Sequence, residues 1–149
     1  MKRKTINTPI GKLTISEQDN AIVQINKDNR QYHDDSKLLD QASKEIHEYF
    51  AGKRQNFTFA IKIDKYPDIY EQLRKVPYGK TISYKQLAIL CNRPKASRFI
   101  GNVMHENPLL LVVPCHRVIK SDGSLGGFGL GLDIKKYLLI LEGIIAHER

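Results

Sequence analysis

The stretch Val112-Val113-Pro114-Cys115-His116-Arg117-Val118 decides how the rest of this 149-residue chain is interpreted. It closes an apolar run that begins at Leu109, and a short continuous apolar run is typical of a buried segment. Cys115 therefore stands where a core gives way to a cleft. Thiolates are strong nucleophiles, and the positive charge of Arg117 favours the thiolate. The alternative is a buried structural cysteine, because free cysteine is among the most buried residue types.

The composition indicates a globular protein. Hydrophobic residues make up 41% of the chain, which suffices for one ordinary domain or two small ones. No run approaches the ~18 apolar residues of a membrane span, and the N-terminus is too polar for a signal peptide. We therefore expect a cytoplasmic protein with no membrane partner. Cys91 and Cys115 should stay reduced there, and neither has partners at zinc-ligand spacing, so we expect no metal and no cofactor.

Positive charge is concentrated in one segment. Between Arg74 and Lys120 there are nine Lys or Arg residues and a single acidic residue, Glu106. Nine positive charges less one negative give +8, which equals the net charge of the whole chain. Such one-sided charge favours a surface for a polyanion such as nucleic acid, although a solvated basic face would show the same bias.

Residues 1–65 predict a small β-rich scaffold domain with one helix. Alternating apolar residues predict a hairpin over residues 5–27, with its turn at residues 17–20. A helix is expected over residues 36–51 with Ser36 as its N-cap. Strict alternation from Phe57 to Ile63 predicts a half-buried strand. No constellation in this part suggests chemistry.

Residues 66–149 predict a second, mainly helical domain. A short helix around residues 69–76 precedes Ser83-Tyr84-Lys85-Gln86, which fits a capping box. The helix that starts there should bury Leu87, Leu90 and Cys91. A second helix should follow residues 92–94 and turn four apolar side chains inward: Phe99, Ile100, Val103 and Met104. Two short helices joined by a tight turn are typical of a helix-turn-helix.

The last part of the chain predicts a pocket wall and a final helix. Residues 125–131 hold four glycines, which permit positive φ and close approach of a ligand to the backbone. Asp133 can cap the last helix. Glu142 lies at the edge of its apolar stripe, where a carboxylate is usually a surface residue but could also be a buried partner for a histidine. The inward stripe is expected to comprise Ile134, Tyr137, Leu138, Leu141 and Ile145.

Residues 76–143 resemble the C-terminal domain of the O6-alkylguanine-DNA alkyltransferases, the methylated-DNA–protein-cysteine methyltransferases. The similarity covers residues 76–79, 83–84, 94–98, 107–108, 114–118, 138–139 and 142–143. Thr8-Pro9-Ile10-Gly11 is similar, more weakly, to the start of the family's N-terminal domain. The resemblance implies an α+β protein: a small ribonuclease-H-like α/β domain, then a winged-helix-like domain with a helix-turn-helix.

The same resemblance implies direct, irreversible repair of O6-alkylguanine in double-stranded DNA by a single-turnover suicide enzyme. Cys115 would accept the alkyl group, His116 would act as its base through a water, and Glu142 would orient the histidine. Asn107 would brace this network, and Tyr84 would protonate guanine N3. The base edge would meet the carbonyls of Cys115 and Val118, the amide of Gly129, and the neighbouring Phe128 and Leu130. DNA would be bound by Lys95, Ala96, Ser97 and Arg98, with Arg98 filling the place of the flipped nucleotide.

Elementary chemistry agrees with these implied roles. Reaction at a base edge requires the base to leave the duplex, and backbone polar groups can read a flipped base. In an extended segment neighbouring side chains point opposite ways, so Cys115 and His116 should not touch directly. A thioether sulfur is a poor leaving group, which argues for a single turnover.

Four positions depart from the family's usual pattern, and three functions compete with alkyl transfer. Phe128 stands in place of tyrosine, and Leu130 stands in place of glycine, where it should narrow the pocket. His105 and Phe99 are the other two departures. The competing functions are a lesion-binding protein without transfer, in which the cysteine would be replaced, a helix-turn-helix regulator, and a cysteine hydrolase that recovers its thiol. We expect a monomer.

Overall fold

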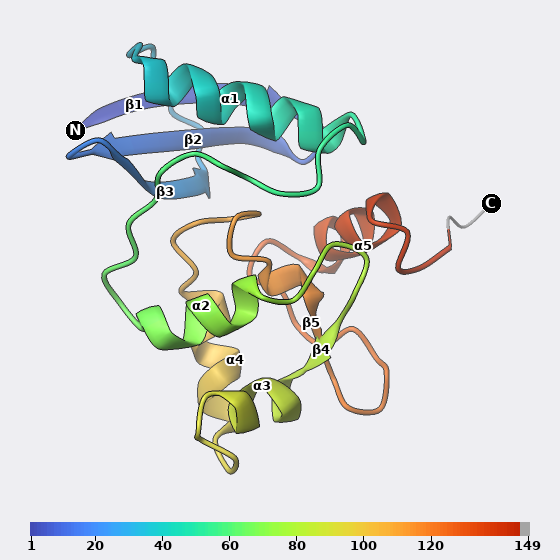
Figure 1. Cartoon of the computed structure of the whole chain (residues 1–149). Coiled ribbons are helices and arrows are strands. Elements are labelled where there is room, and N and C mark those ends of the chain that lie inside the picture. Colours follow the sequence, from blue (N-terminus) through green and yellow to red (C-terminus); the bar gives the residue numbers. More distant parts are fainter. Residues whose placement is uncertain (147–149) are drawn as a thin grey trace. The chain divides into compact units, whose positions relative to one another are not determined.

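The computed structural model describes residues 1–146, which divide into two compact units (Figure 1). One unit comprises Met1–Asp64 together with Pro108–Val112, and the other comprises the remaining residues. The chain therefore leaves the second unit after Asn107, contributes five residues to the first, and returns at Val113. No helix among residues 1–146 is long and apolar enough to cross a membrane.

The first unit is a three-stranded antiparallel sheet covered by one helix. Its strands β1 (Lys2–Thr8), β2 (Gly11–Gln18) and β3 (Ala21–Lys27) lie in that order, and α1 (Lys37–Phe50) packs on them (Figure 1). The expected hairpin is thus β2–β3, with residues 19–20 in the left-handed region at its turn. Ser36 caps α1 as predicted, its side chain accepting from Leu39 N at 2.9 Å. The core includes Leu13, Ile15, Ile22, Ile25, Leu39, Ala42, Ile46 and Tyr49.

The excursion of residues 108–112 runs beside β3. Ile25 N donates to Pro108 O (2.8 Å), and Leu110 N donates to Ile25 O (3.2 Å). Residues 109–113 are all buried, as the apolar run predicts. The stretch just before Cys115 is therefore anchored in the core of the first unit.

The predicted strand from Phe57 to Ile63 is wrong. Only Ile61 forms a β-bridge, with Ile22, and the rest of the segment is irregular. The physical reason is Glu45 of α1, a side chain only 3% exposed. Its carboxylate accepts from Thr58 N (2.7 Å) and from Thr58 Oγ1 (2.7 Å). The Thr58 amide therefore bonds to a side chain instead of to a neighbouring strand.

The second unit holds four α-helices and a short parallel strand pair among its described residues. The helices are α2 (Pro67–Arg74), α3 (Tyr84–Leu90), α4 (Ser97–His105) and α5 (Leu132–Leu141). β4 (Ile82–Ser83) pairs with β5 (Val118–Ile119), and the two lie together in Figure 1. The capping box predicted at Ser83 and Gln86 is confirmed at the start of α3. α3 and α4 pack against each other.

Three helix faces differ from the predicted ones. Leu90 is 51% exposed and Phe99 is 36% exposed, because α3 and α4 are short and bury only narrow stripes. In α5 the buried side chains are Lys135, Leu138 and Leu139, followed by Glu142, while Tyr137 is 38% exposed. The predicted buried face of α5 is wrong because it was placed from the apolar residues alone, whereas the face that is buried begins with Lys135. Asp133 does not cap α5: Gly131 is the N-cap residue.

We expect the Glu45 cluster to stabilise the first unit. Burial by itself raises the pKa of Glu45, but bonds from Thr58 and Gln41 and the charge of Arg54 outweigh it, so the pKa lies below its usual value. Glu45→Ala should lower the free energy of unfolding by about 1–3 kcal/mol, because it orphans the Thr58 amide. Urea denaturation at neutral pH measures this.

A matched variant is Glu48→Ala, whose carboxylate meets only the partly exposed Arg54 side chain and should change stability little. Because the folded-state pKa of Glu45 is depressed, its contribution is present at neutral pH and is lost as the pH falls through that pKa. Equal stability of the Glu45 and Glu48 variants would contradict the assignment.

Candidate active site

Cys115 opens a tight turn and is buried. Residues Cys115–Arg117 form one turn of 3₁₀-helix, η1, closed by a 2.9 Å bond from Arg117 N to Pro114 O. The segment is therefore not extended, and the expected alternation of side chains is wrong for that reason. The turn still directs Cys115 and His116 to different partners, Asn107 and Glu142 respectively.

Asn107 joins the thiol to the start of this turn. Its side-chain Nδ2 donates to Val113 O (2.8 Å) and lies 3.2 Å from Cys115 Sγ. Asn107 and Val113 are also the two residues at which the chain leaves and re-enters the second unit. The Asn107 amide therefore links the two ends of the segment 108–112 and also contacts the Cys115 sulfur.

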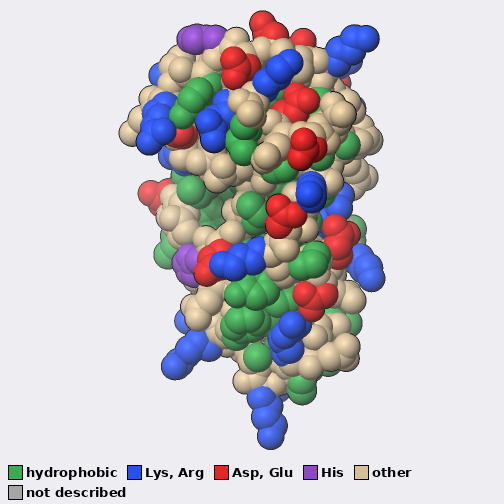
Figure 2. All heavy atoms as spheres, turned by 90° about the vertical axis from the view of Figure 1, so that its left-hand side faces the viewer, with side chains coloured by type: hydrophobic (Ala, Val, Ile, Leu, Met, Phe, Trp, Pro, Cys, Tyr) green, Lys and Arg blue, Asp and Glu red, His purple; other side chains and the backbone are tan. Residues whose placement is uncertain are grey.

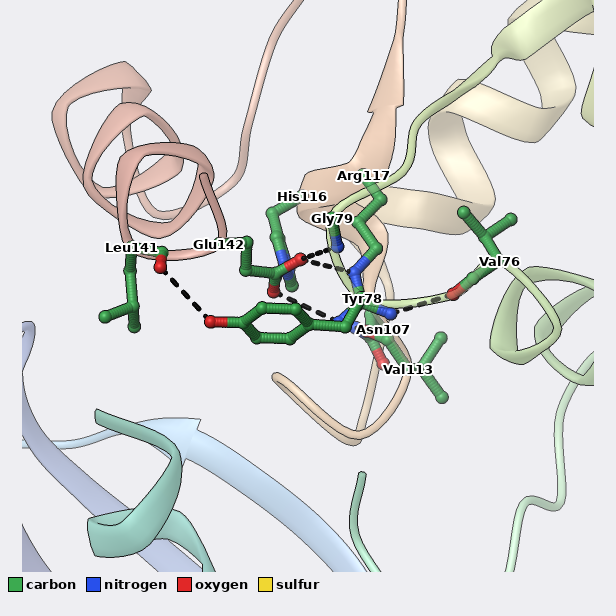
Figure 3. Close-up of polar contacts among 9 residues, drawn as sticks. All are labelled: Val76, Tyr78, Gly79, Asn107, Val113, His116, Arg117, Leu141 and Glu142. Atoms are coloured by element: carbon green, nitrogen blue, oxygen red, sulfur yellow. Dashed lines mark hydrogen bonds and ion pairs between the residues drawn. The ribbon is translucent and has the colours of Figure 1, made fainter. Parts of the chain in front are cut away.

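Glu142 lies at the centre of a buried polar cluster (Figure 3). Its Oε2 is 2.6 Å from His116 Nε2, and both side chains are fully buried. Arg117 donates two hydrogen bonds to the same carboxylate, from Nε to Oε1 at 2.8 Å and from Nη2 to Oε2 at 3.1 Å. Arg117 Nη1 donates to Val76 O (2.8 Å), and Gly79 N donates to Glu142 Oε1 (3.4 Å). Four donors therefore converge on one carboxylate.

The electrostatics of the cluster assign its protons. Burial alone raises the pKa of Glu142, but its bonds and charges with His116 and Arg117 prevail and lower the pKa to about 2. Burial also lowers the pKa of His116, with Arg117 and Lys135 adding to the effect and Glu142 opposing it. An ionised carboxylate can only accept, so a neutral His116 must carry its proton on Nε2. Nδ1 is then an acceptor, and this buried atom has no hydrogen-bond partner among the described residues.

The thiol itself is held in its protonated form. Burial raises the pKa of Cys115, and the Asn107 amide and the positive charge of Lys135 offset this only in part. A thiol with a raised pKa is a weak nucleophile at neutral pH until a base removes its proton. The arrangement therefore calls for a base near the sulfur.

Cys115 lines a small, partly open cavity of about 10 Å³. The glycine-rich segment lines it, as predicted. Such a volume holds about one water molecule, so a purine can enter only if the walls move. The lining residues are Tyr84, Gly101, Met104, His105, Cys115, Gly127, Phe128 and Gly129.

Tyr84 approaches the glycine-rich segment from the start of α3. Its hydroxyl lies 3.4 Å from Gly127 O. Gly126, at φ +74°, passes so close to the ring that an added Cβ would lie 3.1 Å from it. Burial, with a contribution from Cys115, raises the pKa of Tyr84, so the phenol keeps its proton at neutral pH. Tyr84 is therefore a hydrogen-bond donor at the cavity wall.

Two buried cations in this region were not assigned from the sequence. Arg117 belongs to the motif around Cys115, but its grip on Glu142 was not foreseen. Lys135 is fully buried, and its Nζ contacts the carbonyls of Val118 (2.8 Å), Leu125 and Gly127 (3.3 Å). It thereby ties the glycine-rich segment to β5, and burial lowers its pKa to about 8. The detectable signal was its spacing, three residues before Leu138 and seven before Glu142.

The remaining predicted residues lie outside the cavity. Leu130 is half-buried and is not among the described residues that line it. Lys95, Ala96, Ser97 and Arg98 lie at the turn into α4, where Arg98 and Lys95 are exposed and make no ion pair with a described residue. Figure 2 shows mixed acidic, basic and hydrophobic side chains over much of one face, with basic ones extending into solvent at the end where α3 joins α4. Among residues 1–146 there is no cluster of three metal-ligating side chains.

Comparison with known proteins matches both units to one family. Residues 1–63 match the ribonuclease-like domain of 6-O-methylguanine DNA methyltransferase, and residues 64–144 match its DNA binding domain. A constitutive methylated-DNA–protein-cysteine methyltransferase of Bacillus subtilis is 31% identical over 97% of each chain. One from Saccharolobus islandicus is 34% identical over 95% of each.

A solved structure has the same fold. The Mycobacterium tuberculosis OGT, crystallised in complex with DNA, superposes with a TM-score of 0.86 at 29% identity, covering 96% of this chain and 93% of that one.

Removing the charge of Glu142 should destabilise the second unit. Glu142→Gln keeps the shape but leaves Arg117 as an uncompensated buried cation, which should cost about 3–5 kcal/mol of unfolding free energy. Because the pKa of Glu142 is depressed to about 2, the wild-type contribution is fully present at neutral pH and is lost as the pH falls from the ordinary glutamate pKa through about 2. Denaturant unfolding of both proteins at neutral pH measures the difference.

The matched control is Glu106→Gln, which removes the same charge from an exposed pair with Lys65 and should have little effect. Comparable losses of unfolding free energy in both variants would show that the buried cluster stabilises the fold no more than an exposed ion pair does.

Proposed function

The chain belongs to the 6-O-methylguanine DNA methyltransferase family, and on that premise we propose that it repairs O6-alkylguanine in duplex DNA by transferring the alkyl group to Cys115. The observation that carries the proposal is the Asn107–Cys115 contact beside the buried His116–Glu142 pair. A thiol, a base and a carboxylate that orients the base form the arrangement of an activated nucleophile.

In the proposed reaction, His116 removes the thiol proton. Its unpartnered Nδ1 is the available acceptor, and a bridging water would relay the proton from Cys115. The sulfur then forms a bond to the alkyl carbon while the bond from that carbon to guanine O6 breaks. The electron pair leaves with guanine, which takes a proton at N3 from Tyr84. The proton held by His116 then passes through solvent to the Tyr84 phenolate, so that both side chains end as they began.

Groups in the cavity wall and the nearby Val118 carbonyl would hold the base. We assign the carbonyls of Cys115 and Val118 to the exocyclic amine and the amide of Gly129 to O6. The Val118 carbonyl already accepts from Lys135, and a carbonyl oxygen can accept a second bond. Phe128, beside Gly129, would pack against the base, and Leu130 would limit bulky alkyl groups only if the segment shifts on binding.

DNA would be bound at the turn into α4. We propose that α3 and α4 act as a helix-turn-helix within a winged-helix-like domain. The exposed Lys95 and the backbone of Ala96 and Ser97 would meet phosphates, while Arg98 would occupy the stack vacated by the flipped nucleotide. Flipping brings an otherwise buried base edge to Cys115.

The transfer should be irreversible, because no described group can release an alkyl chain from a thioether sulfur. This separates the proposal from a cysteine hydrolase, and Cys115 itself separates it from a lesion-binding protein without transfer. We also propose that the protein is a monomer that acts in the cytoplasm, where Cys115 stays reduced.

One intact-mass experiment tests transfer. Incubation with excess duplex DNA containing O6-methylguanine should add one methyl group per protein molecule, and peptide mapping should place it on Cys115. Cys115→Ser should gain none and should still bind DNA, whereas Cys91→Ser should behave as wild type. Repeated turnover, or a methyl group on Cys91, would rule out the proposal.

A second experiment separates flipping from chemistry. Arg98→Ala should slow repair of duplex DNA by roughly tenfold or more, because the unstacking cost of a few kcal/mol is no longer offset. Reaction with the free base O6-methylguanine should stay near the wild-type rate. Arg74→Ala, which removes an arginine paired with Glu71 on α2, is the control and should affect neither rate. An equal loss on both substrates would mean that Arg98 supports the fold.

A further inference from the structure

A second, larger hollow lies in the same unit, apart from the cavity that holds Cys115. It is an open groove of about 580 Å³ between the end of α2, the loop that follows it, and the outer face of α3. It shares no lining residue with the Cys115 cavity. The lining residues are Gln72, Lys75, Val76, Pro77, Lys80, Thr81, Ile82, Gln86, Ile89 and Leu90.

The groove is apolar inside. Val76, Pro77 and Ile82 form one side, and Ile89 and Leu90 of α3 form the other. Ile89 and Leu90 are each 51% exposed, although they are large aliphatic side chains next to each other in sequence. An exposed apolar groove of this kind is typical of a surface that binds a partner.

The border of the groove is positively charged. Lys75 and Lys80 are exposed, and neither pairs with an acidic side chain of the described residues. No acidic residue lines the groove. The basic side chains between Arg74 and Lys120 therefore do not all lie at the turn into α4, since Lys75 and Lys80 stand at this separate border.

These features select one class of occupant. Duplex DNA would satisfy the lysines but would leave the aliphatic side chains without apolar partners. A second copy of this chain would bring a net charge of +8 toward the same lysines. A polypeptide with both apolar and acidic side chains can pack against the apolar interior of the groove and pair with the two lysines at its border.

We propose that this groove docks an acidic segment of a partner protein, which inserts apolar side chains between α2 and α3 and pairs its carboxylates with Lys75 and Lys80. Nothing in this surface reaches Cys115, so docking would recruit the protein without altering its chemistry. The proposal does not depend on which substrate the Cys115 site takes.

The test selects peptides from a random display library on the wild-type protein, with Leu90→Glu as the counter-selection target. Enriched peptides should combine Asp or Glu with Leu, Ile or Phe. Fluorescence anisotropy with a synthetic copy should then show binding that Lys75→Glu/Lys80→Glu weakens by about tenfold or more. The control Lys2→Glu/Lys53→Glu makes the same change in net charge on the first unit and should bind as wild type.

Circular dichroism should show that all variants are folded, and their methyl-transfer rates with the free base O6-methylguanine should match wild type. Four results would overturn the proposal: no groove-dependent peptide, enriched peptides that lack acidic residues, displacement of the peptide by undamaged duplex DNA, or a wild-type dimer that Leu90→Glu dissociates. Cys115 does not line the groove, so Cys115→Ser should bind the peptide as wild type does, and the two proposals fail separately.

Discussion

The ionised carboxylate of Glu142 is the constraint on which the second unit depends. It lies in the interior and is tolerable there only because Arg117, His116 and the Gly79 amide supply donors. Arg117 in turn needs the carboxylate, since a buried guanidinium without a counter-charge would be costly. This mutual dependence fixes α5 against the turn at Cys115. It also fixes the orientation of the His116 ring.

The two units contribute differently to the thiol. The first unit carries no reactive group, yet its core holds residues 108–112 and so anchors the chain immediately before the turn. Asn107 bonds across the ends of this excursion and reaches the sulfur. Lys135 then secures the glycine-rich wall from the other direction through three carbonyls. The space beside Cys115 is consequently small, about 10 Å³.

Much of this arrangement followed from local sequence, and the rest required tertiary contacts. The cap at Ser36 and the capping box at Ser83 depend on neighbours three residues away, so sequence predicted them well. The strand expected at Phe57–Ile63 was wrong because Glu45, distant in sequence, captures the Thr58 amide. The motif around Cys115 identified the thiol and the histidine.

The buried charges were harder to foresee. A stripe of apolar residues is the usual mark of a core face, and α5 instead buries Lys135 and Glu142 on that face. Arg117 was likewise unassigned, because its partner is 25 residues away. Charged residues are ordinarily placed at the surface, and only the paired geometry explains their burial.

The central claim is that burial keeps His116 neutral and that Glu142 holds the ring proton on Nε2, so that Nδ1 can accept the proton of Cys115. The most direct measurement is the ¹⁵N–¹H correlation spectrum of the His116 ring in the DNA-free protein across a pH titration. The account predicts the neutral Nε2–H tautomer at neutral pH, with conversion to imidazolium only below the ordinary histidine pKa. An imidazolium at neutral pH, or a neutral ring protonated on Nδ1, would contradict it.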